Sequence, residues 1–208
     1  MKPSLTLSFT ALLLLLPALP SLRGQGVSTT QKYAKYQTDC DGGDAASCQK
    51  LAVGYQFGLV VTKDDAKASA LYSQADAMYR KRCDGGEAAA CTSLGINYQI
   101  GLGVPEDDTH AIALYRQGCN GGDAHGCTLL GAMFIAGLGI AQDKAQAMVL
   151  YRKGCDSGDG NGCTRLGTMF DDGDGVTQDK AQATALYRKG CDDHDSEGCY
   201  KLKKLTPK

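Results

Sequence analysis

Apolar residues recur in this chain with a helical spacing that repeats along most of its length. In each of four segments a Cys is followed by a Leu three residues later and by an aromatic residue seven later, as at Cys127, Leu130 and Phe134. This spacing places the three side chains on one face of an α-helix. A second apolar face follows in each segment, with Leu150 and Tyr151 as its example. The pattern therefore predicts an all-α protein built from pairs of helices.

Aspartate and glycine mark the predicted ends of these helices. An Asp before an apolar face can cap a helix N-terminus by accepting hydrogen bonds from free backbone N–H groups, and a Gly after it can end the helix in the left-handed conformation. In the third repeat Asp123 precedes the first helix, Gly137 ends it and Asp143 precedes the second helix. The predicted N-caps of all units are Asp44, Glu87, Asp123, Asp159 and Asp195 for the first helices and Asp64, Asp107, Asp143 and Asp179 for the second helices.

The helix pairs form a tandem array. The first Cys of each C-x7-C pair stands at position 40, 83, 119, 155 or 191, which gives one step of 43 residues and three of 36. A single helix pair cannot bury its own apolar faces, whereas stacked pairs can. We therefore expect one α/α superhelical solenoid over residues 31–205. It comprises an N-terminal capping helix at 31–40, repeats at about 44–83, 87–119, 123–155 and 159–191, and a C-terminal capping helix at 195–205.

The long first step contains seven additional residues, from Ser73 to Tyr79. Seven residues are close to two helical turns, so their insertion nearly preserves the apolar face. Neither Gly nor Pro occurs from position 65 to position 82. The second helix of the first repeat is therefore predicted to run unbroken from about Asp65 to Arg82, longer than its counterparts at 108–118, 144–154 and 180–190.

The N-terminal residues 1–24 resemble a secretory signal peptide. Lys2 precedes an apolar run from Ala11 to Leu16, which is too short to span a bilayer. Residues 25–30 are predicted to be a flexible leader. We expect a secreted or periplasmic protein that is a monomer and has no membrane span after signal removal. The net charge of the whole chain is only −1, so nothing favours a nucleic-acid partner.

The repeating units resemble Sel1-like repeats, which are relatives of tetratricopeptide repeats. Their C-x7-C form resembles the cysteine-rich Hcp family, described as β-lactamase-like, and the resemblance covers about residues 31–205. It implies a solenoid that serves as a binding scaffold. It also implies an alternative function, namely a β-lactamase-type amide hydrolase or a binder of penicillins and muropeptides.

All ten cysteines fall in C-x7-C pairs, which in an exported chain predicts disulfides rather than free thiols or zinc ligands. Two pairings are open in antiparallel helices: one across each turn, as in Cys119 with Cys127, and one across each hairpin, as in Cys91 with Cys119. The second leaves Cys40 and Cys199 unpaired, whereas the first uses every cysteine and agrees with the resemblance. The predicted bridges are Cys40–Cys48, Cys83–Cys91, Cys119–Cys127, Cys155–Cys163 and Cys191–Cys199.

Few residues could support the alternative enzymatic function. Serine β-lactamases need an S-x-x-K motif with companion S-D-N and K-T-G motifs. The chain has one S-x-x-K, from Ser47 to Lys50, and neither companion, and Cys48 inside the motif is assigned to a disulfide. The three histidines form neither H-x-H nor H-E-x-x-H. We therefore assign no catalytic residue, no metal site and no cofactor.

The binding hypothesis places a ligand on the concave face of the solenoid. In the related tetratricopeptide fold, this face is lined by residues of the first helix of each repeat. Counted from the position that the second cysteine of each pair occupies here, these residues stand at offsets −2, +1, +5 and +8. Neutral hydrogen-bonding residues predominate there and suit an extended peptide or a glycan, although ordinary solvated positions are the alternative. The candidate binding residues are Gln49, Gln56, Thr92, Gln99, His125, Thr128, Asn161, Thr164 and Asp171, and Val53, Ile96, Ala132, Ile135 and Thr168 share their offsets.

The sequence leaves three functions open. The first is an exported, non-catalytic scaffold that binds a protein, peptide or glycan. The second is the binder or hydrolase of β-lactams or cell-wall fragments that the resemblance implies. The third is an assembly factor similar to the cysteine-rich repeat proteins of the mitochondrial intermembrane space, against which the signal peptide argues.

Overall fold

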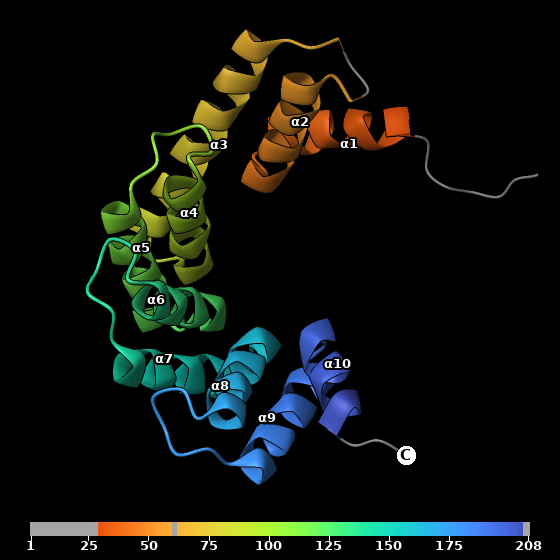
Figure 1. Ribbon diagram of the computed structural model, residues 1–208. Coiled ribbons are helices and arrows are strands. Elements are labelled where there is room, and N and C mark those ends of the chain that lie inside the picture. Colours follow the sequence, from red (N-terminus) through yellow and green to blue (C-terminus); the bar gives the residue numbers. More distant parts are fainter. Residues whose placement is uncertain (1–28, 60–61, 206–208) are drawn as a thin grey trace, which may run out of the picture.

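The fold is an array of α-helices, seen in a computed structural model of the chain (Figure 1). The structure describes residues 29–59 and 62–205, and within these ranges it contains ten helices and no strand. The helices are α1 (Thr29–Asp41), α2 (Ala45–Phe57), α3 (Asp65–Asp84), α4 (Ala88–Ile100), α5 (Asp108–Asn120), α6 (Ala124–Ala136), α7 (Lys144–Asp156), α8 (Gly160–Asp172), α9 (Lys180–Asp192) and α10 (Ser196–Leu205).

Consecutive helices form hairpins that stack into an arc. The helices α2, α4, α6, α8 and α10 line the inner, concave side of the arc, and α3, α5, α7 and α9 form its outer, convex side (Figure 1). This arrangement confirms the predicted all-α solenoid. The first helix begins at Thr29, two residues before the predicted capping helix, so the end of the predicted leader is helical. The predicted signal peptide lies outside the described residues.

Most of the predicted caps set the helix boundaries. Asp123, for example, accepts a hydrogen bond from the backbone N–H of Gly126 at 3.1 Å, and α6 ends at Gly137, whose φ is 69°. A positive φ of this kind favours Gly, because a side chain would crowd the backbone. Glu87 is the exception, because it makes no side-chain cap bond and instead pairs with Arg82.

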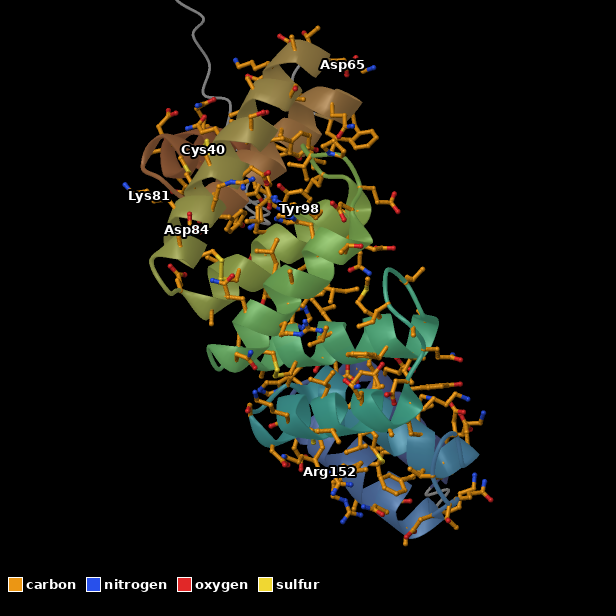
Figure 2. All side chains as sticks on the ribbon, turned by 90° about the vertical axis from the view of Figure 1, so that its left-hand side faces the viewer. Cys40, Asp65, Lys81, Asp84, Tyr98 and Arg152 are labelled. Atoms are coloured by element: carbon orange, nitrogen blue, oxygen red, sulfur yellow. A yellow bond between two sulfur atoms is a disulfide. The ribbon has the colours of Figure 1, made fainter. Side chains whose placement is uncertain are left out.

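The seven additional residues of the first repeat lengthen α3. This helix spans 20 residues, whereas α5, α7 and α9 span 13 each. Figure 2 shows it unbroken from Asp65 to Asp84. The apolar face continues through the added turns, because Ala75 and Tyr79 are 0% and 7% exposed. The prediction of one long helix is therefore confirmed.

The extended part of α3 also buries a carboxylate. Asp76 is only 5% exposed, and its Oδ1 accepts a 2.7 Å hydrogen bond from Nδ2 of Asn97 in α4. The Oδ1 of Asn97 in turn accepts from Nε2 of Gln49 in α2, also at 2.7 Å. In the next two repeats, buried Met133 and Met169 occupy the position of Asn97. The junction between the first two repeats is therefore polar where the later junctions are apolar.

Tyrosines of the convex helices fill the space inside each hairpin. Tyr115 and Tyr187 are completely buried, and Tyr151 is nearly so. The ring of Tyr115 lies so close to Gly95 of α4 that an added Cβ would stand 2.8 Å from it. The glycine four positions after Cys91, Cys127 and Cys163 therefore allows the two helices of a hairpin to pack closely around a tyrosine ring.

Five disulfides hold the turns that lead from one hairpin to the next. Each joins the end of one helix to the start of the following concave helix, with Cα–Cα distances of 4.4–4.7 Å. They use all ten cysteines in the turn-spanning pattern and leave no cysteine free. The pairs are Cys40–Cys48, Cys83–Cys91, Cys119–Cys127, Cys155–Cys163 and Cys191–Cys199.

Candidate functional site on the concave face

Three of the predicted binding residues are buried, and one of them, Thr164, borders a small cavity on the concave side. Thr92, Thr128 and Thr164 are at most 3% exposed. Each packs against a glycine of its partner convex helix: a Cβ added to Gly118 of α5 would lie 2.2 Å from Oγ1 of Thr92. The next concave helix covers the threonine from the other side, because a Cβ on Gly126 would lie 2.6 Å from the same oxygen. Thr92 and Thr128 are therefore enclosed between helices, and contact of the three threonines with a ligand stays a prediction.

The polar residues at offset +8 are hydrogen-bonded within their own hairpins. In three hairpins the tyrosine of the convex helix donates its hydroxyl to the +8 residue of the concave helix. Burial raises the pKa of one of these hydroxyls, that of Tyr187, to about 12, so it remains a neutral donor at physiological pH. The three bonds join Tyr72 to Gln56 at 2.8 Å, Tyr115 to Gln99 at 2.6 Å and Tyr187 to Asp171 at 3.3 Å.

The third hairpin lacks this hydrogen bond and has a small recess in its place. Ile135 occupies the +8 position there, and the hydroxyl of the buried Tyr151 interacts with the side chain of Arg165 in α8. A cavity of about 190 Å³ opens beside these residues on the concave side. Asp172 and Glu197 contribute carboxylates to its lining. The recess is therefore a place where the repeat pattern is broken and side-chain volume is missing.

Two further candidates are engaged in contacts inside the protein. Gln49 donates to Asn97, as described above, and Oδ1 of Asn161 accepts a hydrogen bond from Nε of Arg165 at 2.6 Å. Together with the tyrosine bonds, these contacts occupy much of the neutral polar row that the sequence indicated. Fewer hydrogen-bonding groups are thus free for a ligand than the sequence suggested.

His125 contacts the N-cap residue of the next concave helix. Its Nδ1 lies 3.5 Å from Oδ2 of Asp159, and the imidazole is 52% exposed. Hydrogen bonding to Asp159 and the negative charge of that carboxylate raise the pKa of His125. Burial by itself would raise the pKa of Asp159, but hydrogen bonds from His125 and Thr128 outweigh it and lower this pKa. The pair therefore links the third and fourth repeats through a titratable contact.

We expect the stability of the protein to decrease as this histidine loses its proton. Because the folded pKa of His125 is raised, its contribution is complete below about pH 6.5 and is lost as the pH rises through the folded value. For a half-exposed pair, this loss of unfolding free energy is about 0.2–1 kcal/mol. Urea denaturation at about pH 6 and about pH 8.5 measures it. His125→Ala should remove the difference and His194→Asn should retain it, and equal pH dependence in both variants contradicts the assignment.

The accessible part of the concave face is apolar at its centre. Ile96, Leu129 and Ile135 are half-buried there, and Ile100 is 59% exposed. We refer to these four residues as the inner apolar patch. Leu129 and Ile100 stand at offsets +2 and +9, which the sequence reasoning did not include. Because these offsets lie three and four residues from +5, helical spacing alone could have identified them.

Offsets +2 and +9 carry different residue types at the two ends of the concave face, and at the N-terminal end Phe57 takes the +9 position and is 65% exposed. Near the N-terminal end, Lys50 is exposed and its ammonium lies 5.5 Å from the ring centroid of Tyr36. Near the C-terminal end, Arg165 and Asp172 take the +2 and +9 positions. The inner face thus has exposed apolar side chains at its centre and at Phe57, and its fully charged end is the C-terminal one, in contrast to the neutral hydrogen-bonding row that was predicted.

The S-x-x-K motif is not arranged as a catalytic site. Ser47 is 3% exposed in the first turn of α2, where its backbone N–H donates to the cap residue Asp44 at 3.0 Å. Cys48 is in a disulfide. Within residues 29–59 and 62–205, no group of His, Cys, Asp and Glu side chains could hold a metal ion. Nor does any helix in those ranges have the length and apolar character needed to cross a membrane.

The repeats match a known protein family. The sequence model of the Sel1 repeat matches residues 45–75, 88–123, 124–159 and 160–195. Because these matches cover more than half of the chain, the protein belongs to the Sel1 repeat family. The first match ends inside the extension of α3, whereas each of the other three spans a complete hairpin. Sel1 repeats form scaffolds that are typical of protein–protein interaction.

Solved structures of several bacterial proteins are similar to this one. A Sel1 repeat protein from Oxalobacter formigenes is 24% identical with a TM-score of 0.62, over 83% of this chain and 71% of that one. The protective antigen c5321 of uropathogenic Escherichia coli is 25% identical with a TM-score of 0.58. The match covers 84% of this chain and 44% of the antigen. Cysteine-rich protein B (HcpB) of Helicobacter pylori is 27% identical with a TM-score of 0.53. The match covers 64% of this chain and 96% of HcpB. No curated protein matches the chain in sequence.

Proposed function

We propose that this protein is an exported scaffold that binds a peptide segment of a partner protein on its concave face. The observation that carries this proposal is the inner apolar patch, which combines Ile100, 59% exposed, with half-buried Ile96, Leu129 and Ile135. Exposed apolar surface of this kind, bordered by charged residues, is typical of protein-binding sites. Covering the patch removes apolar area from water, which is favourable by about 25 cal/mol per Å².

A peptide with aliphatic or aromatic side chains fits this surface better than a glycan does. Glycans are held by many hydrogen bonds, but the side chains of Gln56, Gln99 and Asn161 already take part in hydrogen bonds within the protein. The patch instead offers carbon-rich side chains, and the recess beside Ile135 can accept one side chain of the ligand. Anchoring of a few apolar side chains on a preformed helical surface is a common mode of peptide recognition.

Export is supported by the chemistry of the cysteines. Five disulfides are stable in an oxidising compartment and are rare in the cytosol. Together with the similarity to HcpB, they are consistent with an extracytoplasmic protein. The signal-like pattern of residues 1–24 supports a secreted or periplasmic location. The alternative function on β-lactams gains no support from Ser47, which is buried by helix packing.

Selection of peptides from a random phage-displayed library on the oxidised protein tests the proposal. We expect enriched peptides to carry aliphatic or aromatic anchors and to lose roughly tenfold or more in affinity with Ile100→Asp, because a charge would replace an apolar contact. Val149→Asp on the convex side is the matched control, since Val149 is 64% exposed and Ile100 is 59% exposed. Binding that is weakened by the Val149 variant and not by the Ile100 variant would show that the concave assignment is wrong.

A further inference from the structure

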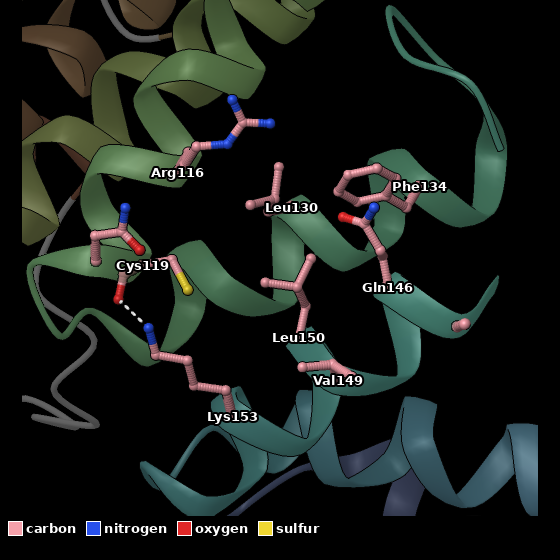
Figure 3. Close-up of a pocket in the computed structure, with 10 residues that line it drawn as sticks. Arg116, Cys119, Leu130, Phe134, Gln146, Val149, Leu150 and Lys153 are labelled. Atoms are coloured by element: carbon pink, nitrogen blue, oxygen red, sulfur yellow. Dashed lines mark hydrogen bonds between the residues drawn. The ribbon is translucent and has the colours of Figure 1, made fainter. Parts of the chain in front are cut away.

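A groove on the convex side has features that the proposed function does not use. It lies between α5 and α7 with α6 as its floor, and its volume is about 440 Å³, within the range of small-molecule sites (Figure 3). Leu130 and Phe134 of α6 and Leu150 of α7 give it a carbon-rich lining. We refer to it as the α5–α7 groove.

Cationic side chains stand on one side of this groove. Figure 3 shows Arg116 and Lys153 on one side, with Phe134 on the opposite side and Leu130 between them. The Nζ of Lys153 donates to the backbone oxygen of Cys119 at 3.0 Å. Arg116 makes no hydrogen bond or ion pair with any residue that the structure describes, and no lining residue carries a carboxylate. The positive charge at this side of the groove is therefore not neutralised by the lining.

The preceding repeat covers the equivalent arginine. Arg80 corresponds to Arg116, and it donates to the hydroxyl of Tyr98 at 3.0 Å. The ring of Tyr98 is in turn packed against His110, with 4.2 Å between ring centroids. Phe134 stands at the position of Tyr98 in the α5–α7 groove and has no hydroxyl to offer, so the guanidinium of Arg116 remains available.

The following repeat pairs its lysine with a carboxylate. Asp156 stands there at the position of Asn120, and it lies 3.6 Å from Nζ of Lys189. The first and last convex helices also carry an aspartate at this position, Asp84 and Asp192, so Asn120 is the single departure among the four convex helices. Replacement of the carboxylate by an amide is what leaves the α5–α7 groove positively charged.

The same groove carries an additional apolar side chain. Val149 is 64% exposed and lies in its lining. The equivalent residues in the neighbouring convex helices are Ala113 and Ala185. A larger apolar side chain at an exposed position stabilises no helix packing, but it extends the surface that a bound hydrocarbon chain can cover.

We propose that the α5–α7 groove binds an aliphatic carboxylate of medium chain length. The carboxylate pairs with the guanidinium of Arg116, whose geometry suits two parallel hydrogen bonds to such a group. The hydrocarbon chain lies on Leu130, Phe134 and Val149. A peptide fits less well, because its backbone amides would lose water over a carbon-rich lining that offers them few partners. The site faces away from the inner apolar patch, so this proposal does not rest on the peptide-binding function.

Titration of the ¹⁵N-labelled, oxidised protein with octanoate and decanoate tests the site. In ¹H–¹⁵N correlation spectra we expect saturable shifts in the amides of α5 and α7. Decanoate should bind roughly five- to fifteenfold more tightly than octanoate, because each buried methylene contributes about 0.8 kcal/mol. Decanol and decyltrimethylammonium carry comparable chains without the negative charge and should bind at least about threefold more weakly.

Variants that copy the neighbouring repeats provide matched controls. Asn120→Asp restores the carboxylate of the other convex helices and should lower decanoate affinity about three- to tenfold, and Arg116→Ala should lower it similarly. Val149→Ala, which copies Ala113 and Ala185, should lower decanoate affinity roughly two- to fourfold. Arg152→Ala is the control on the next repeat, where Figure 2 shows Arg152 on the convex side, and it should leave affinity unchanged.

Three results would overturn the proposal. The first is equal affinity for decanoate and decanol, which would mean that the charge is not recognised. The second is unchanged affinity in both Asn120→Asp and Arg116→Ala. The third is tighter binding of an acetylated, amidated peptide that alternates Leu with Asp, with shifts in the same amides, because the site would then recognise protein instead of an acyl chain. Ile100→Asp on the concave face should alter none of these measurements.

Discussion

Removal of the central disulfide is expected to lower the free energy of unfolding by about 3 kcal/mol. The double variant Cys119→Ala with Cys127→Ala opens a nine-residue ring, and in the loop-closure model such a ring removes roughly 2–3 kcal/mol of unfolded-state entropy. Both cysteines are at most 2% exposed, so loss of their sulfurs also leaves a small cavity. Urea denaturation followed by circular dichroism measures the change.

The terminal disulfide is the matched control for this prediction. Cys191–Cys199 closes a ring of the same size but attaches only α10 at the end of the array. In a solenoid each hairpin contacts only its neighbours, so loss of a central link divides the array, whereas loss of a terminal link frays one helix. We expect the terminal double variant to lose less than the central one. Equal losses, or a central loss below about 1 kcal/mol, would show that the bridges do not couple the repeats.

The fold could be predicted from the sequence because its determinants are local. A helix cap needs only an Asp and the backbone N–H groups of the next turn, and Asp123 with Gly126 is one such pair. The unbroken α3 followed from a seven-residue insertion without Gly or Pro. The turn-spanning disulfides join residues eight positions apart. Each of these features depends on residues that are close in the chain.

The concave face was harder to predict because its exposure depends on how closely helices approach. The threonines at offset +1 are buried because Gly118, Gly154 and Gly190 let the convex helices come close to them. In the first repeat, Arg82 stands at the position of these glycines, and Gln49 at offset +1 is only half-buried. The glycine that directly precedes the first cysteine of a pair was thus a signal that the threonines belong to the helix interface. Arg82 replaces this glycine in the first repeat and marked Gln49 as the exception.

The polar junction of the first two repeats also had a signal in the sequence. Asn97 stands where later repeats have Met133 and Met169, and the extension of α3 contributes Asp76. A polar residue in an otherwise apolar register, next to an inserted acidic residue, indicates a buried pair. Which two side chains meet could not be inferred, because that depends on the rotation of α3 against α4.

Loss of the Asn97 amide is expected to be strongly destabilising at neutral pH. Asn97→Leu removes the hydrogen-bond donor of the Asp76 carboxylate, which is 5% exposed, and the acceptor of Gln49. A buried polar group without its partner costs about 1–3 kcal/mol, and more when it is charged. We therefore expect the free energy of unfolding to fall by about 2–4 kcal/mol at pH 7. Urea denaturation measures this change. Leu129→Ala is the control, because it removes packing of a half-buried apolar side chain on the concave face and touches no buried charge.

The pH dependence of this loss distinguishes the buried charge from a packing defect. Burial raises the pKa of Asp76, while the hydrogen bond from Asn97 and the charge of Arg80 lower it, so removing Asn97 raises it further. For a carboxyl whose folded pKa is raised, the penalty is complete above the folded pKa and disappears as the pH falls toward the unfolded value.

The deficit of Asn97→Leu relative to the parent protein should therefore shrink on acidification. It should also be largely relieved at pH 7 by a second substitution, Asp76→Leu, which leaves an apolar junction like those at Met133 and Met169. A deficit that is constant from about pH 7 to about pH 4, or a double variant no more stable than Asn97→Leu alone, contradicts the role of the buried carboxylate.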